Sequence, residues 1–145
     1  MATGISYSPL LISEFEGDHR KLLRQYGILL NTAKQEDFAA FKAHLTEFKA
    51  MLVSHLLKET VKLYIYMRQK LKDDPHSYAL VTGYKKEMDG IGKVAMNFVD
   101  TYMAQTADRV DFAQLVAELQ HIGSVLGDRI RREEAELYPL YHDAY

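Results

Sequence analysis

The spacing of apolar residues constrains this chain more than any other feature, because they recur every three or four positions over four long segments. Steps of three and four keep side chains on one face of an α-helix. Charged and amide residues fill the positions between them, as expected on outward faces. The residues that we predict on the inward faces are Ile12, Phe15, His19, Leu22, Tyr26, Leu29 and Ala33; Phe38, Phe41, Leu45, Phe48, Leu52, His55, Glu59, Leu63 and Tyr66; Val81, Tyr84, Met88, Ile91, Ala95, Phe98 and Tyr102; and Phe112, Leu115, Leu119, Ile122, Leu126, Ile130, Glu133, Leu137 and Leu140.

The connections between the four segments are short. They fall near residues 34–37, 72–77 and 106–111. Short connections make neighbouring helices antiparallel. Ser13, three residues before Glu16, indicates a capping box at the start of the first helix. We therefore predict an all-α fold, an up-down-up-down antiparallel four-helix bundle.

Composition limits the class of protein. The 145 residues are 48% hydrophobic and 26% charged, which is typical of one globular domain spanning 1–145. Apolar runs stay far below the roughly 20 residues that cross a bilayer, and the N-terminal residues lack the order of a secretion signal. A net charge of −2 argues against direct nucleic-acid binding. We expect a cytoplasmic protein with no membrane segment, and the absence of cysteine excludes thiolate sites.

Four polar residues interrupt the apolar faces. His19, His55, Glu59 and Glu133 stand where the helical period predicts Leu or Phe. A lone inward histidine is usually a hydrogen-bonded core residue, and a lone inward glutamate usually extends to water. Four together, on three segments and in the half of the bundle that holds both chain ends, indicate a shared polar site with or without an ion. A buried carboxylate is costly unless it is paired or binds a metal.

These residues resemble the hemerythrin-like, or HHE cation-binding, family. The matching motifs are Asp18-His19-Arg20, the H-x-x-x-E sequence HLLKE at 55–59, and the closing sequence RIRREEAELYPLY at 129–141. In that family five histidines and two bridging carboxylates hold two irons. The resemblance implies that His19 and His55 bind one iron and that Glu59 and Glu133 are the bridges.

The second iron of that family has no equivalent ligands in this chain. The three places where the resemblance requires histidine hold Tyr84, Met88 and Arg129. None of these side chains can replace a neutral imidazole. We therefore expect no O₂ carriage, which in that family needs both irons. Two outcomes stay open: a mononuclear Fe, Mn or Zn site, or a metal-free polar core in which Arg129 replaces the lost cation.

A second resemblance is to the Rsd/AlgQ regulators, which bind the housekeeping sigma factor. It lies in Ile122-Gly123, Leu126, Arg129, Glu133 and Leu137, and in Leu45, Phe48, Leu52-Val53, Leu56 and Tyr64. This resemblance implies a protein partner in place of a metal.

Tyrosines gather near the predicted helix ends in the half that holds the site. They are Tyr64, Tyr66, Tyr138, Tyr141 and Tyr145. They either close the end of the bundle or form a contact patch for a homodimer or another protein. We expect a non-enzymatic bundle that acts in sensing or regulation, with the sigma-factor regulator as the alternative and an oxidase or peroxidase third.

Overall fold

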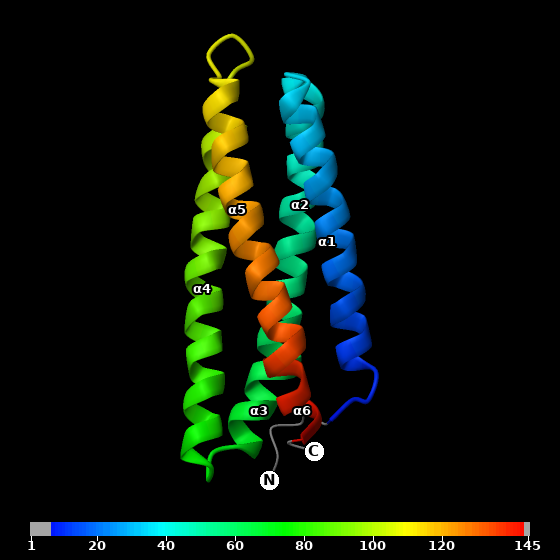
Figure 1. Cartoon of the computed structure of the whole chain (residues 1–145), viewed down its shortest axis with the longest axis vertical. Coiled ribbons are helices and arrows are strands. Elements are labelled where there is room, and N and C mark those ends of the chain that lie inside the picture. The colour runs from blue at the N-terminus through cyan, green and yellow to red at the C-terminus, as the bar shows by residue number, and fades with distance from the viewer. Residues whose placement is uncertain (1–6, 144–145) are drawn as a thin grey trace.

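Four antiparallel helical rods make up the computed structural model, which describes residues 7–143 (Figure 1). The first and third rods are single helices, whereas the second and fourth each contain a π-helical stretch. The rods are α1 (Leu11–Lys34); α2 (Phe38–Lys58) with η1 (Glu59–Tyr64) and α3 (Ile65–Lys70); α4 (Pro75–Met103); and α5 (Phe112–Arg132) with η2 (Glu133–Leu137) and α6 (Tyr138–Asp143). The predicted all-α up-down-up-down bundle is confirmed.

The last three rods begin behind an aspartate. Asp37, Asp74 and Asp111 each accept a hydrogen bond from the backbone N–H three residues later, at 3.1 to 3.3 Å. Such caps satisfy N–H groups that have no partner within the helix. They fix where each chain reversal ends, so that α1 packs on α2 and α5, and α4 packs on α2, α3 and α5.

The first helix starts earlier than the capping-box prediction. It begins at Leu11, whose N–H donates to the carbonyl of Ser8 at 3.2 Å, so Ser13 lies inside the helix and caps nothing. The predicted box between Ser13 and Glu16 is wrong. Leu11 and Phe15 are both buried, and their burial extends the helix beyond the point that local signals indicate.

The core consists of two apolar clusters with a polar layer between them. One cluster fills the half near the α1–α2 and α4–α5 connections, and includes Leu29, Phe41, Leu45, Phe98 and Leu115. The other fills the half where α1 begins and α6 ends, and includes Phe15, Leu63, Met67, Leu137 and Tyr141 (Figure 1). Within residues 7–143 no helix combines the length and apolar content that crossing a bilayer requires.

The π-helices shift the register of the buried face. In a π-helix the hydrogen bonds run to the fifth residue along, so a π turn holds one residue more than an α turn. After η2 the buried residues are Tyr138 and Tyr141, whereas the predicted Leu140 is only partly buried. The 3.6-residue period that predicts Leu140 does not allow for the additional residue.

The tyrosines at the end of the bundle where α1 begins and α6 ends, here called the closed end, are buried. Tyr64, Tyr66, Tyr138 and Tyr141 are all at most 4% exposed, so these four close the bundle and do not form a surface contact patch. Tyr145 lies outside the described residues.

Candidate metal centre

The structure brings the four predicted ligands to one point. His19, His55, Glu59 and Glu133 are at most 3% exposed, and one donor atom from each lies within 4.8 Å of all the others. The two imidazole Nε2 atoms are 3.1 Å apart. His55 Nε2 lies 2.8 Å from Glu59 Oε1, and His19 Nε2 lies 3.1 Å from Glu133 Oε1. The predicted convergence of these residues is present, and their metal-binding role stays a prediction.

Both carboxylates of the cluster stand at the start of a π-helix. Glu59 is the first residue of η1, and Glu133 is the first residue of η2. The π turn places residues five apart on one face, whereas an α-helix separates them by about 140°. As a result Glu59 and Tyr64 both reach the interior, as do Glu133 and Tyr138. Single π turns inside α-helices occur frequently at functional sites.

A carboxylate holds each imidazole from the side away from the cluster. His19 Nδ1 lies 2.7 Å from Glu134 Oε2, and His55 Nδ1 lies 3.0 Å from Asp18 Oδ2. Lys58 Nζ lies 2.7 Å from the same Asp18 oxygen. An anionic acceptor favours a proton on Nδ1, which leaves the Nε2 lone pair directed into the site. This arrangement of carboxylate, imidazole and inward-facing nitrogen is typical of metal-ligating histidines.

Burial and the surrounding charges shift the pKa values of all four residues. Burial raises the pKa of Glu59 to about 7, although contact with His55 works in the opposite direction. Burial acts in the same sense on Glu133, but its contacts with His19 and Arg129 lower its pKa overall. Burial disfavours charged imidazoles, yet the neighbouring carboxylates raise the pKa of both histidines. Protons and a metal ion therefore compete for the same donor atoms.

One buried oxygen supports the fit of a cation. Within residues 7–143, no donor makes a well-aligned hydrogen bond to Glu59 Oε1, although His55 Nε2 lies 2.8 Å away. Buried carboxylate oxygens are normally satisfied. The donor set of two imidazole nitrogens and two carboxylates suits Fe, Mn or Zn. The residues present therefore fit a single ion.

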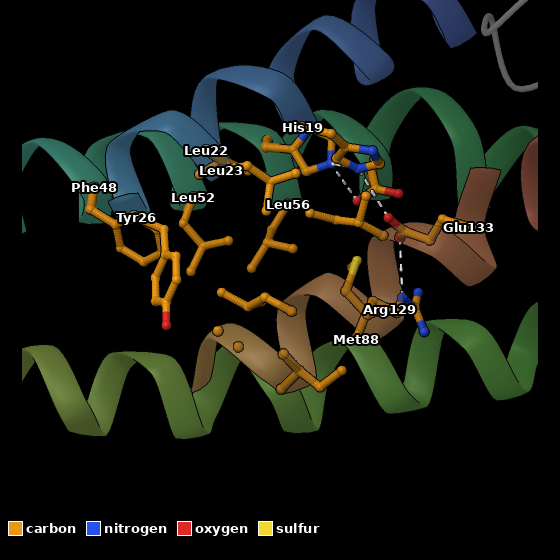
Figure 2. Close-up of a pocket in the computed structure, with 17 residues that line it drawn as sticks. His19, Leu22, Leu23, Tyr26, Phe48, Leu52, Leu56, Met88, Arg129 and Glu133 are labelled. Atoms are coloured by element: carbon orange, nitrogen blue, oxygen red, sulfur yellow. Dashed lines mark hydrogen bonds and ion pairs between the residues drawn. The ribbon is translucent and has the colours of Figure 1, made fainter. Parts of the chain in front are cut away.

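Arg129 lies on the far side of Glu133 and is buried (Figure 2). Its Nε donates to Glu133 Oε2 at 3.2 Å, while Oε1 of the same carboxylate faces His19. Its Nη1 donates to Glu87 at 2.9 Å and its Nη2 donates to the Tyr64 hydroxyl at 2.6 Å. Glu133 is thus shared between the guanidinium and the cluster, much as a bridging carboxylate is shared between two cations.

Tyr84 and Met88, the two other residues at places where the resemblance requires histidine, lie against this guanidinium and beside the adjoining cavity. The Tyr84 ring lies under Arg129, 4.7 Å from ring centroid to Cζ, and its hydroxyl donates to Glu136 at 2.7 Å. Such stacking on an aromatic face stabilises a desolvated cation. Met88 is buried and lines the adjoining cavity.

A small cavity of about 40 Å³ adjoins the cluster. Figure 2 shows His19, Glu133 and Arg129 at one end and Tyr26 and Phe48 at the other. Beyond the cluster and Arg129, apolar and aromatic side chains line its wall, and the space suits molecules little larger than water.

Helices α1 and α5 approach closely beside the cavity. A Cβ added at Gly123 would lie 2.2 Å from Cζ of Tyr26. The Tyr26 ring can therefore pack against α5 only because residue 123 is a glycine and has no side chain.

Sequence reasoning missed several residues that contact the site. They are Asp18, Glu134, Tyr64, Tyr138 and Glu87. Asp18 and Glu134 each adjoin a predicted ligand in sequence, and an acidic neighbour of that kind is a usable signal for a partner that orients a histidine. The two tyrosines gave no such signal, because only the π turns direct them inward.

The model of the hemerythrin HHE cation-binding domain matches residues 10–141, which include all the cluster residues. No curated protein and no solved structure matches the chain. The resemblance to the Rsd/AlgQ regulators finds no support in these comparisons.

Proposed function

The chain belongs to the hemerythrin HHE cation-binding domain family, and we propose from this premise that it binds one transition-metal ion, foremost iron, with Mn or Zn as alternatives. His19, His55, Glu59 and Glu133 are the proposed ligands. The observation that carries the proposal is the pair of Nε2 atoms, 3.1 Å apart, whose rings are tied at Nδ1 to carboxylates. Two inward lone pairs at that distance repel each other unless a cation or a proton lies between them.

We propose a single ion, because Arg129 supplies the second positive charge. Its guanidinium bonds the carboxylate of Glu133 that would otherwise bridge two metals. Arginine stays protonated in proteins, so this charge is permanent. A one-metal site lacks the second iron on which O₂ carriage in the family depends, and this supports a role other than O₂ transport.

The proposed role is sensing or regulation and not catalysis. The cluster is buried, and apart from the cluster and Arg129 the side chains that line the cavity beside it are apolar or aromatic. Such a wall offers few groups to bind and orient a polar substrate. A metal at this point would connect residues of α1, α2, η1 and η2, so its arrival or loss would change how three rods are held together. Binding of a sigma factor and formation of a homodimer stay predictions.

Metal analysis of the purified full-length protein tests this proposal. Protein prepared without chelator is expected to contain about one Fe, Mn or Zn per chain, and His55→Ala is expected to lose it. His121→Ala is the matched control, because His121 is an exposed histidine of α5, and it should retain the metal. Wild-type protein without a stoichiometric metal would overturn the proposal, as would equal metal content in His55→Ala and His121→Ala.

A further inference from the structure

A fifth candidate donor atom, the hydroxyl oxygen of Tyr138, lies among the proposed ligand atoms. The Tyr138 hydroxyl is 3.1 Å from His19 Nε2, 3.3 Å from Glu59 Oε2 and 3.4 Å from Glu133 Oε1. Tyr138 is 2% exposed. It therefore contacts three of the four proposed ligands and is shielded from solvent.

These separations match the spacing of neighbouring donors around one ion. In a six-coordinate site with bonds of about 2.1 Å, adjacent ligand atoms lie about 3 Å apart. The nitrogen and oxygen atoms of the cluster are 2.8 to 3.1 Å from one another along its edges. The phenol oxygen lies 3.1 Å from His19 Nε2 and 3.4 Å from Glu133 Oε1, which are two of the atoms on these edges, and 3.3 Å from Oε2, the other oxygen of Glu59. It therefore stands beside them at the distance of a neighbouring donor.

The fold holds the phenol in this place from two directions. The π turn of η2 brings Tyr138 to the face of Glu133, five residues earlier. The Tyr138 ring stacks on His19, with 5.7 Å between centroids and 14° between planes, and also contacts Phe15. A buried ring with these two ring contacts loses little further freedom when its oxygen binds an ion.

We propose that Tyr138 is a fifth metal ligand and binds ferric iron as a phenolate. This inference rests on the proposed function. When the iron–oxygen bond forms, the phenol O–H bond breaks, its proton is released to water, and no electron is transferred. The ion then has two nitrogen and three oxygen ligands, a set that favours Fe³⁺ over Fe²⁺ because three of the donors are anionic oxygens.

The test is the visible and resonance Raman spectrum of the full-length protein loaded with ferric iron, with iron measured on the same samples. Wild type is expected to show a tyrosinate-to-iron charge-transfer band and enhanced phenolate ring vibrations. Tyr138→Phe should lose both. Tyr141→Phe is the control, because Tyr141 is a buried tyrosine of the same helix whose hydroxyl accepts from the Ser8 N–H; it should keep both.

Iron-containing wild type without the band would overturn the inference, and so would a band that survives in Tyr138→Phe. Wild type that takes up no iron would remove this inference and the proposed function together, and the iron measurement separates that result from the first. If Tyr138→Phe does not fold, deuterated tyrosine in wild type shows whether the bands belong to a tyrosinate, because phenolate bands must shift on ring deuteration. Tyr64→Phe, which removes the other buried phenol on the Arg129 side of the cluster, should then keep the bands, and their loss in that variant would overturn the inference.

Discussion

At the scale of single residues, the orientation of the two histidines depends on side chains that lie outside the cluster of proposed ligands. Asp18 and Glu134 accept from the outer nitrogens of the two histidines and so direct the inner nitrogens. Partners of this kind orient a metal ligand and increase its basicity. The charge of Asp18 is in turn shared with Lys58 at 2.7 Å.

Asp18→Asn should therefore weaken metal binding by about 10- to 100-fold. The change keeps the shape of the side chain and removes the negative charge beside His55. Glu14→Gln is the matched control, since Glu14 also pairs with Lys58, at 3.1 Å. A chelator-competition titration measures both affinities, and equal values for the two variants would show that Asp18 acts only through Lys58.

The guanidinium of Arg129 balances buried negative charge. Arg129→Met should lower the free energy of unfolding of the metal-free protein by about 3–5 kcal/mol, because it removes the buried cation that bonds Glu133 and takes away the donor to the Tyr64 hydroxyl. Arg131→Met, at a side chain that is 73% exposed, should change it by no more than about 0.5 kcal/mol. Urea unfolding gives both values, and similar losses in the two variants would contradict this role.

At the scale of helical elements, the two π turns give the closed end its arrangement. Each begins at a proposed ligand and lets a tyrosine five residues later reach the same interior. If η2 accommodates one residue more than an α-helix, removal of that residue should restore α geometry, in which residues four apart share a face.

Deletion of exposed Ala135 from η2 should therefore leave a folded protein that still binds metal, with Glu133 and the tyrosine then four residues apart. Deletion of Ser124, a small exposed residue in regular α5, should rotate the two halves of that rod by about 100° against each other. Circular dichroism and metal analysis distinguish the two. Loss of the fold in the Ala135 deletion, or full tolerance of the Ser124 deletion, would refute this account of the π turn.

The two π turns are also the part of the fold that the sequence did not predict. The 3.6-residue period and the short connections were sufficient for the four rods, and the polar interruptions were sufficient to predict the meeting of His19, His55, Glu59 and Glu133. The period fails after η2, where Tyr138 and Tyr141 are buried and Leu140 is only partly buried. A π turn depends on packing between the helices of the bundle, and that packing cannot be predicted from the spacing of apolar residues along the sequence.

At the scale of the whole molecule, the site lies between two apolar clusters and draws ligands from three of the four rods. The fourth rod, α4, supplies Glu87 to Arg129 and Tyr84 beneath it. A bound ion would therefore join the first, second and fourth rods, while the guanidinium joins the fourth rod to the third through Glu87 and to the second through Tyr64.

Metal should consequently stabilise the fold as a whole. A metal concentration 100 times the dissociation constant is expected to raise the free energy of unfolding by about 2.7 kcal/mol, and each kcal/mol should raise the Tm by about 2–4 °C. Calorimetry with and without metal measures the shift. His55→Ala should show little of it, and an equal shift in that variant would indicate binding elsewhere on the molecule.

The number of ions bound per chain tests the central claim most directly. Metal-free protein is titrated with ferrous iron under anaerobic conditions, and bound iron is measured after unbound iron has been removed. One ion per chain is the expected end point, because four buried ligands converge on one position and Arg129 provides the other positive charge. Two ions per chain, or none, would contradict it.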